Sequence, residues 1–219
     1  MSVPTLVLAS ASPARLETLR RAGLSPEVEV SGVDEEAIHA DNVPDLVALL
    51  ARAKAEAVAQ RRASTGAVIV VGCDSLLELD GVGFGKPVDE TDAVRRWQLM
   101  RGRSGMLHTG HHLLRLPGGA SRTATASTTV HFADLDDAEI DAYVATGEPL
   151  LVAGAFTIDG LGGPYVTRIE GDHHNVVGIS LPLLRQLLAD LGVSWADLRQ
   201  LSPEVRPDGA RSPRSLPSR

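Results

Sequence analysis

A serine-rich segment followed by an arginine stands close to the N-terminus. An apolar run breaks at Ser10, and Ser12 and Pro13 suit the N-cap and first position of a helix. Apolar residues then recur every three positions, at Leu16, Leu19 and Ala22. The pattern predicts a strand, a tight loop and a helix whose first amides and Arg15 could bind an anion such as phosphate. An ordinary helix start with a solvated Arg15 is the alternative that this stretch leaves open.

Carboxylates and lysines that suit the same chemistry follow. Glu35 lies in an acidic corner, Lys54 lies at the edge of an apolar helical stripe, and Lys86 follows a glycine. The continuously apolar, β-branched run 67–73 predicts a strand buried on both faces of a largely parallel sheet, with Asp74 at its carboxyl end. Ligands bind at that edge of open α/β sheets, which makes Asp74 a functional candidate. The alternatives are a solvated Lys54 and an Asp74 that caps a turn.

The remaining periodicity predicts the elements that must position these side chains. Apolar patterns and stop signals predict a short strand at 27–33 and helices at 44–62, 91–100, 134–146 and 183–191. A hairpin should turn at Asp80-Gly81, and strands 107–116 and 122–132 should form an antiparallel pair. Trp97 and Met100 are interpreted as core residues. The Pro/Ser/Arg-rich segment 203–219 predicts a disordered tail.

Composition sets outer limits on function. The 219 residues, 43% of them hydrophobic, are enough for a full core, and the net charge of −7 argues against nucleic acid and anionic membrane surfaces as partners. With Cys73 as the one cysteine, no intrachain disulfide or Cys-based zinc site can form. No signal peptide or membrane span is evident, which predicts a cytoplasmic protein. A metal cluster is not expected from the histidines at 108, 111, 112 and 131.

These residues together indicate phosphoanhydride hydrolysis. Cations and helix amides suit a polyphosphate, while Asp74 and Glu35 suit a divalent metal or a water molecule that loses a proton. The glycine-rich run 81–87 is not a phosphate-binding Walker loop, because Pro87 stands where that motif has Ser or Thr. No Ser-His or Cys-His nucleophile stands out. Direct attack by water is therefore the simpler route.

Nine short motifs follow one another along nearly the whole chain. They are Leu-Ala-Ser-x-Ser-Pro-x-Arg at 8–15, Asp-Glu at 34–35, Ala-x-x-Lys-Ala at 51–55, Val-Gly-x-Asp at 71–74, Gly-Lys-Pro at 85–87, Ser-Gly at 104–105, Glu-Pro-Leu at 148–150, Ala-Gly-Ala-Phe at 153–156 and Val-Val-Gly at 176–178. In this ordered set the sequence resembles the Maf family of nucleoside triphosphate pyrophosphatases.

The resemblance implies an α/β fold similar to inosine triphosphatases, with an elongated mixed β-sheet, flanking helices and a central cleft, in a domain spanning 1–202. It implies that a nucleoside triphosphate, standard or modified, is cleaved to the monophosphate and pyrophosphate with Mg²⁺ or Mn²⁺. Family members often form homodimers, and the assembly of this chain stays open. The alternative function is a nucleotide-binding regulator of cell division or septum formation with little turnover.

The resemblance also assigns roles residue by residue. Asp74 would accept the proton of the attacking water, with Glu35 helping to hold the metal or the water. The triphosphate would be held by a set of hydroxyl and cationic residues: Ser10, Ser12, Arg15, Lys54 and Lys86. Three positions set the base in two branches of the family, and here they carry Ala14, Ser75 and Asp159. These match neither branch, so a preference for one base does not transfer.

Overall fold

The computed structural model describes residues 3–62 and 66–199. The tail predicted at 203–219 lies outside them. The described residues include seven strands: β1 (Thr5–Leu8), β2 (Glu27–Val28), β3 (Val68–Leu79), β4 (Val82–Phe84), β5 (Ser104–Leu116), β6 (Ser121–Phe132) and β7 (Val166–Glu170). They form one sheet in the order β2-β1-β3-β5-β6-β7, with β4 added to β3. The strand predicted at 27–33 is thus only two residues long.

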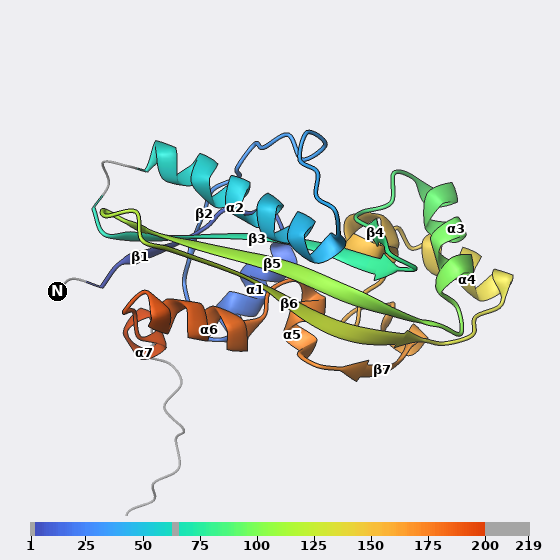
Figure 1. Cartoon of the computed structure of the whole chain (residues 1–219). Coiled ribbons are helices and arrows are strands. Elements are labelled where there is room, and N and C mark those ends of the chain that lie inside the picture. The colour runs from blue at the N-terminus through green and yellow to red at the C-terminus, as the bar shows by residue number, and fades with distance from the viewer. Residues whose placement is uncertain (1–2, 63–65, 200–219) are drawn as a thin grey trace, which may run out of the picture.

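The sheet is mixed, and the prediction that it is largely parallel is wrong. Only β1 pairs in parallel, with β2 and β3, whereas the pairs β3–β4, β3–β5, β5–β6 and β6–β7 are antiparallel. The apolar run in β3 is buried because helices cover both faces of the sheet there, and burial does not depend on strand direction. The long hairpin of β5 and β6 was predicted and is confirmed (Figure 1).

The helices begin at residues that cap them. The α-helices are α1 (Pro13–Arg21), α2 (Val43–Arg61), α3 (Glu90–Met100), α4 (Asp137–Val144), α5 (His173–Val177), α6 (Leu181–Asp190) and α7 (Trp195–Leu198), and the 3₁₀ turns are η1 (Glu148–Leu151), η2 (Ala153–Ala155) and η3 (Gly163–Tyr165). Ser12 caps α1 as predicted, with its hydroxyl accepting the amide of Arg15. None of these described helices has the length and apolar character needed to span a bilayer.

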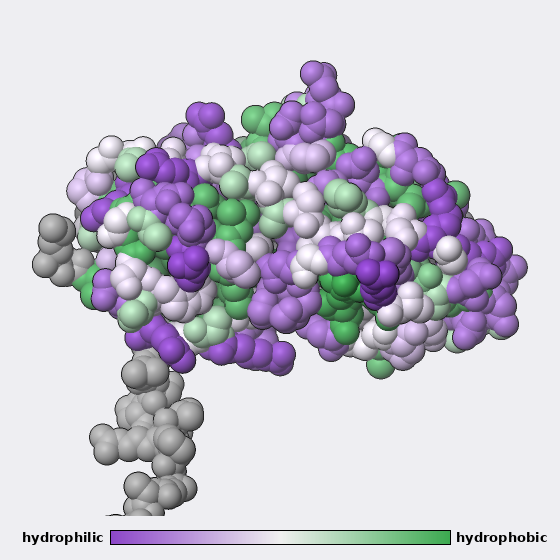
Figure 2. Space-filling model, turned by 60° about the horizontal axis from the view of Figure 1, so that its bottom comes forward, coloured by the Kyte–Doolittle hydropathy of each residue, from purple (hydrophilic) through white to green (hydrophobic). Residues whose placement is uncertain are grey.

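Helices cover the sheet in two layers. Helix α2 lies on one face, while α5 and α6 lie on the other (Figure 1). Leu184 and Leu188 of α6 pack with Ile69 and Val71 in one core cluster. A second cluster centres on Trp97 and Met100, which are almost fully buried as predicted. On the face that carries α5 and α6, hydrophilic side chains alternate with small apolar areas (Figure 2).

Strand β3 is longer than the sequence suggested. Asp74 lies in the middle of this strand rather than at its carboxyl end, because the apolar alternation continues through the buried Leu77 and Leu79. The hairpin to β4 then turns at Asp80 and Gly81, which adopt positive φ angles of 53° and 79°. The predicted turn is confirmed, but the capping role considered for Asp74 is wrong.

One edge of β3 has a gap between two partner strands. β1 pairs with β3 only as far as Val71, and β4 pairs with it only from Leu77 onward. No described strand pairs with this edge at 72–76, although the other edge of β3 pairs with β5 throughout that stretch. Figure 1 shows β1 and β4 toward opposite ends of β3. The gap leaves room for a cleft beside Asp74.

Helix α2 lies unusually close to the sheet because two strand positions are glycines. A Cβ added at Gly72 would lie 2.0 Å from the carbonyl oxygen of Ala51, and one at Gly110 would lie 2.1 Å from that of Val47. Both contacts are with helix backbone, which cannot swing aside. The glycines of β3 and β5 therefore set the height of α2 above the sheet.

Replacing Gly110 with alanine should force α2 away from the sheet. Overpacking of this kind costs about 1–3 kcal/mol of unfolding free energy, and contact with backbone places Gly110→Ala at the upper end. Urea denaturation followed by circular dichroism measures the change. Gly163→Ala is the matched control, since its added Cβ would meet only an oxygen at 3.4 Å. Equal midpoints for the two variants would contradict the close-packing argument.

Candidate active site

A cleft of about 370 Å³ opens at the gap in the edge of β3. Eight of the ten residues that the sequence nominated line it, all except Ala14 and Asp159. They come from five segments: Ser10, Ser12 and Arg15 from the β1–α1 junction, Glu35 from the following loop, Lys54 from α2, Asp74 and Ser75 from β3, and Lys86 from the loop after β4. The fold thus brings together side chains that are up to 76 residues apart, the separation of Ser10 and Lys86.

Lys54 joins two carboxylates at the centre of the cleft. Its Nζ donates to Oδ1 of Asp74 and lies 2.7 Å from Oε1 of Glu35. Only 8% of Lys54 and 7% of Asp74 is exposed, so the interpretation of Lys54 as a solvated rim residue is wrong. Gly72 and Gly110 hold α2 close to the sheet, which leaves the lysine side chain little room to extend into water.

Burial makes Asp74 a stronger base than an ordinary aspartate. Desolvation raises the pKa of this carboxyl above its usual 3.8, and the positive charges of Lys54 and Arg15 offset only part of that effect. A carboxylate with a raised pKa accepts a proton more readily, provided that the working pH keeps it ionised. Asp74 therefore has the character required of a general base.

Arg15 is held at three of its nitrogen atoms. Its Nε donates to the Gly178 carbonyl oxygen at 2.7 Å, Nη1 to Ser10 Oγ at 3.0 Å, and Nη2 to Ser75 Oγ at 2.9 Å. A guanidinium has five N–H donors, so these three bonds leave two more. Arg15 is only 9% exposed. The alternative of a solvated Arg15 is therefore wrong, and the cation presents a fixed fork to the cleft.

Two polar residues that the sequence did not nominate hold Ser75 in place. Thr109 Oγ1 lies 2.9 Å from Ser75 Oγ and donates to the Asn175 carbonyl oxygen at 3.2 Å. Asn175 is fully buried and donates in turn to the Leu107 carbonyl oxygen at 3.1 Å. Neither residue could be found from spacing, because the strand pairing that opposes Ser75 and Thr109 is not written in local periodicity.

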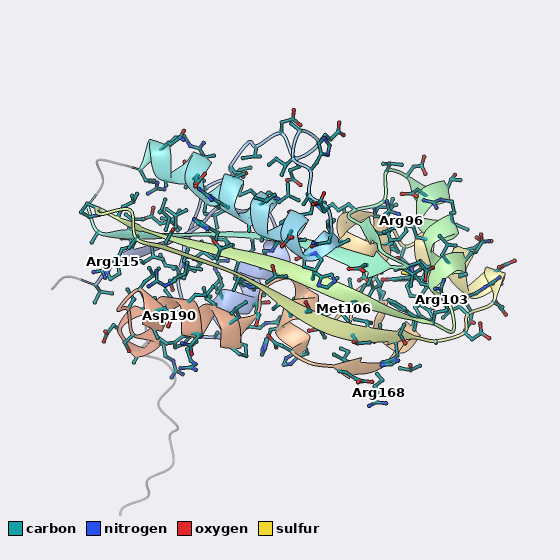
Figure 3. The ribbon with its side chains drawn as sticks, in the orientation of Figure 1. Arg96, Arg103, Met106, Arg115, Arg168 and Asp190 are labelled. Carbon is teal, nitrogen blue, oxygen red and sulfur yellow. The ribbon has the colours of Figure 1, made fainter. Side chains whose placement is uncertain are left out.

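Arg96 on α3 shapes the loop that carries Lys86. Its Nη1 donates to the Gly85 carbonyl oxygen at 2.6 Å and its Nη2 to that of Lys86 at 3.3 Å. A 2.6 Å ion pair with Asp92 fixes the guanidinium, which Figure 3 shows at the side of α3 that faces β4. Asp92 and Arg96 are four residues apart in a helix, so their ion pair could have been predicted from the sequence. The loop is held by its backbone, which leaves the exposed Lys86 side chain available to the cleft.

The positions of the lysines in the sequence also pointed to the cleft. Lys54 and Lys86 are the only lysines among the 219 residues, whereas the other basic residues are arginines or histidines. Both lysines line this one cleft. Lysine offers a compact ammonium on a flexible stem and differs from arginine in its hydrogen-bond geometry. The sequence alone could have singled out both positions on this ground.

The two remaining nominated residues do not line the cleft. Asp159 lies in a second pocket of about 340 Å³, together with Thr18 and Arg21 of α1 and His173 and His174 of α5. Ala14 is half-buried on the first turn of α1 and lines neither of these two pockets. Ala14, Ser75 and Asp159 are therefore not gathered in either of these two pockets.

The buried cysteine and the most deeply buried histidine serve the structure. Burial raises the pKa of the Cys73 thiol to about 12, which removes its nucleophilic thiolate at neutral pH. Burial lowers the pKa of His111 to about 4, so its neutral ring accepts the Ser180 amide at Nε2, 2.9 Å away. These two groups are therefore inert at neutral pH.

Sequence comparisons agree with this geometry. The family model described as Maf-like protein matches residues 5–191. Proteins named nucleoside triphosphate pyrophosphatase are 56% identical in Salinispora tropica, over 97% of this chain and 96% of the relative, and 57% identical in Streptomyces coelicolor, over 88% and 93%. The chain belongs to the Maf family. A Maf-family relative of the same name from Nocardia farcinica is 57% identical over 89% of this chain and 96% of its own length.

A solved structure is also similar in part. A nucleoside-triphosphatase, described as a dITP/XTP pyrophosphatase, from Mycobacterium abscessus aligns with 85% of this Maf-family chain and 94% of its own chain at 15% identity. The TM-score is 0.38.

The raised pKa of Asp74 should appear in the pH dependence of stability. The folded protein retains the Asp74 proton to higher pH than the unfolded chain, whose carboxyl titrates near 3.8. As pH rises through this window, ionisation therefore favours the unfolded chain. The quantity to follow is the unfolding free energy of the wild type minus that of Asp74→Asn. We expect this difference to fall as the pH rises above 3.8 and to level off beyond the pKa of Asp74 in the folded protein. Urea titrations across pH measure it, and a difference that rises would refute the assignment.

Proposed function

We propose that this protein hydrolyses nucleoside triphosphates to nucleoside monophosphates and pyrophosphate. The observation that carries the proposal is the single cleft in which a buried carboxylate of raised pKa, Asp74, meets the cations Arg15, Lys54 and Lys86. Relatives more than half identical over most of this chain bear the name nucleoside triphosphate pyrophosphatase.

Asp74 acts as the base that takes a proton from the attacking water. Its carboxylate is almost buried, and one oxygen accepts from Lys54. Lys54 keeps the carboxylate ionised, because protonation of Asp74 would weaken the ion pair. The raised pKa then brings its basicity closer to that needed at neutral pH. The bond from Lys54 also orients the Asp74 carboxylate toward the cleft.

Cations on two sides of the cleft hold the phosphates. Arg15 has two N–H donors beyond its bonds to the protein, and Ser12 stands at the amide-rich start of α1. Lys86 reaches in from the opposite end of the gap, on a loop fixed by Arg96. Negative charge that develops on the leaving pyrophosphate is stabilised most by donors that are already in place. Ser10 contributes to phosphate binding by holding Arg15 in position, and not only by direct contact with a phosphate.

The donor set also fits a divalent cation. Glu35 and Asp74 are oxygen ligands, and Lys54 contacts only one oxygen of each. Mg²⁺ and Mn²⁺ prefer such oxygens, and Mg²⁺ is commonly held by one or two carboxylates together with substrate phosphates. When bound there, such an ion would supply positive charge that neutralises the triphosphate. Glu35 is about half exposed, so its side chain has room to turn toward the ion.

A substrate panel tests the activity. Purified protein is incubated with Mg²⁺ or Mn²⁺ and each standard or modified nucleoside triphosphate, and pyrophosphate is measured. We expect release from at least one substrate, and a loss of about 10²- to 10⁴-fold in kcat for Asp74→Asn, the range for a missing general base. Glu36→Gln, a carboxylate change in the same acidic corner as Glu35, is the control and should retain activity.

Two outcomes would overturn the proposal. Pyrophosphate that is absent from every reaction would exclude the activity, and tight nucleotide binding without it would favour the regulatory alternative. Equal rates for the wild type and Asp74→Asn would leave the activity but remove Asp74 from its role. Binding of a nonhydrolysable triphosphate to both proteins separates loss of chemistry from loss of affinity.

Arg15 should require its guanidinium and not only its charge. Arg15→Lys keeps the positive charge but cannot bond to Gly178, Ser10 and Ser75 at once. We expect kcat/KM to fall roughly 10- to 100-fold, which corresponds to the ~1.5–3 kcal/mol of a charged hydrogen bond. Arg20→Lys, an exposed change on the same helix, is the control. Steady-state kinetics on the best substrate of the panel decides, and an equal effect of both changes would refute the role.

A further inference from the structure

Three metal-ligand side chains converge at the start of α5, outside the proposed catalytic cleft. Asp172, His173 and His174 each offer one ligand atom, and these atoms all lie within 4.8 Å of one another. The two imidazole rings lie side by side, with centroids 3.7 Å apart and planes inclined by 37°. Two imidazoles and one carboxylate are ligands that Zn²⁺ and similar transition metals accept.

The spacing within this Asp-His-His cluster fits a shared ion better than a strong hydrogen bond. His174 Nδ1 lies 3.3 Å from Asp172 Oδ1. Ligand bonds of about 2.0–2.2 Å at tetrahedral angles place neighbouring ligand atoms of one ion about 3.3–3.6 Å apart, whereas N–H···O bonds are usually about 2.9–3.0 Å. The observed separation therefore lies in the range of two ligands around a common centre.

A buried oxygen supplies an independent reason to place a cation here. Asp172 Oδ1 caps α5 by accepting the His174 amide at 3.0 Å. The other oxygen, Oδ2, is buried and receives no hydrogen bond from the described residues. A buried carboxylate oxygen without a donor is costly, and most such oxygens in proteins have a partner. A cation held by both carboxylate oxygens of Asp172 would satisfy it.

The two histidines of the cluster border a pocket with space for further ligands. His173 and His174 line the pocket of about 340 Å³ between α1 and α5, together with Asp159. The pocket also contains Arg21, but its guanidinium makes a 2.9 Å ion pair with Glu17, which compensates its charge. A metal with three protein ligands commonly keeps a water in an open position. The pocket therefore suits a metal that remains accessible from solvent.

We propose that Asp172, His173 and His174 bind one divalent transition-metal ion, best represented by Zn²⁺. This site differs in chemistry from Glu35 and Asp74, whose oxygens suit harder ions. It also has a route to the cleft: α5 is only five residues long, and the Gly178 carbonyl just beyond its end accepts the 2.7 Å bond from Arg15. A metal at the start of α5 would therefore lie one short helix away from the carbonyl that holds Arg15.

Metal binding can be measured without any nucleotide. Full-length protein is stripped with a chelator and titrated with Co²⁺, whose visible spectrum reports imidazole ligation, and then with Zn²⁺ by calorimetry. We expect one ion per chain for each metal and a higher unfolding temperature with Zn²⁺. Removing only the hydrogen-bond partner of a metal ligand weakens metal binding roughly 10- to 100-fold. His173→Ala and His174→Ala remove a ligand itself, so each should weaken Zn²⁺ binding by more than that.

Two further variants make the result decisive. Asp172→Asn keeps a side-chain oxygen that can cap α5 but lacks the charge, and it should weaken Zn²⁺ binding while circular dichroism stays unchanged. His39→Ala removes an exposed histidine outside the cluster and should bind as the wild type does. No stoichiometric binding by the wild type, or equal affinity in all four variants, would overturn the proposal. Neither result depends on whether the protein hydrolyses nucleotides.

Discussion

The contact of helix α2 with the sheet determines the chemistry of the cleft. Because β3 and β5 carry Gly72 and Gly110 beneath the helix, its backbone reaches the strands directly. Lys54 is consequently buried against Asp74 instead of extending into water. Removing two charges from water is expensive, and here the ion pair with its second carboxylate, Glu35, offsets part of that cost. The protein thus maintains a carboxylate whose basicity comes from packing.

The second constraint is the interrupted strand pairing along one side of β3, a strand inside the sheet. Segments that approach Asp74 from both ends of the gap meet there because β1 and β4 share the same edge of β3. The loop after β1 contributes Ser10 and leads to Arg15, and the loop after β4 contributes Lys86. Hydroxyl and cationic groups therefore flank the buried carboxylate along the strand direction, an arrangement that suits an extended polyanion.

The sequence predicted those features that depend on residues close together in the chain. The cap at Ser12, the turn at Asp80, the long hairpin and the core position of Trp97 all follow from residue type and spacing. Strand direction, the length of β3 and the burial of Lys54 do not, because each depends on which segments pair at long range. Thr109, which supports Ser75 across the paired strands, escaped prediction for the same reason.

The interrupted edge of β3 also affects how the protein meets other proteins. An exposed strand edge is a template on which a strand of another molecule can pair, and such edges promote aggregation. Here the free stretch is confined to 72–76, between the pairs that end at Val71 and begin at Leu77. A foreign strand long enough to pair would collide with β1 or β4, whereas a small ligand can enter. The gap that opens into the cleft is therefore closed to pairing by a strand of another molecule, while the outer strands of the sheet are β2 and β7.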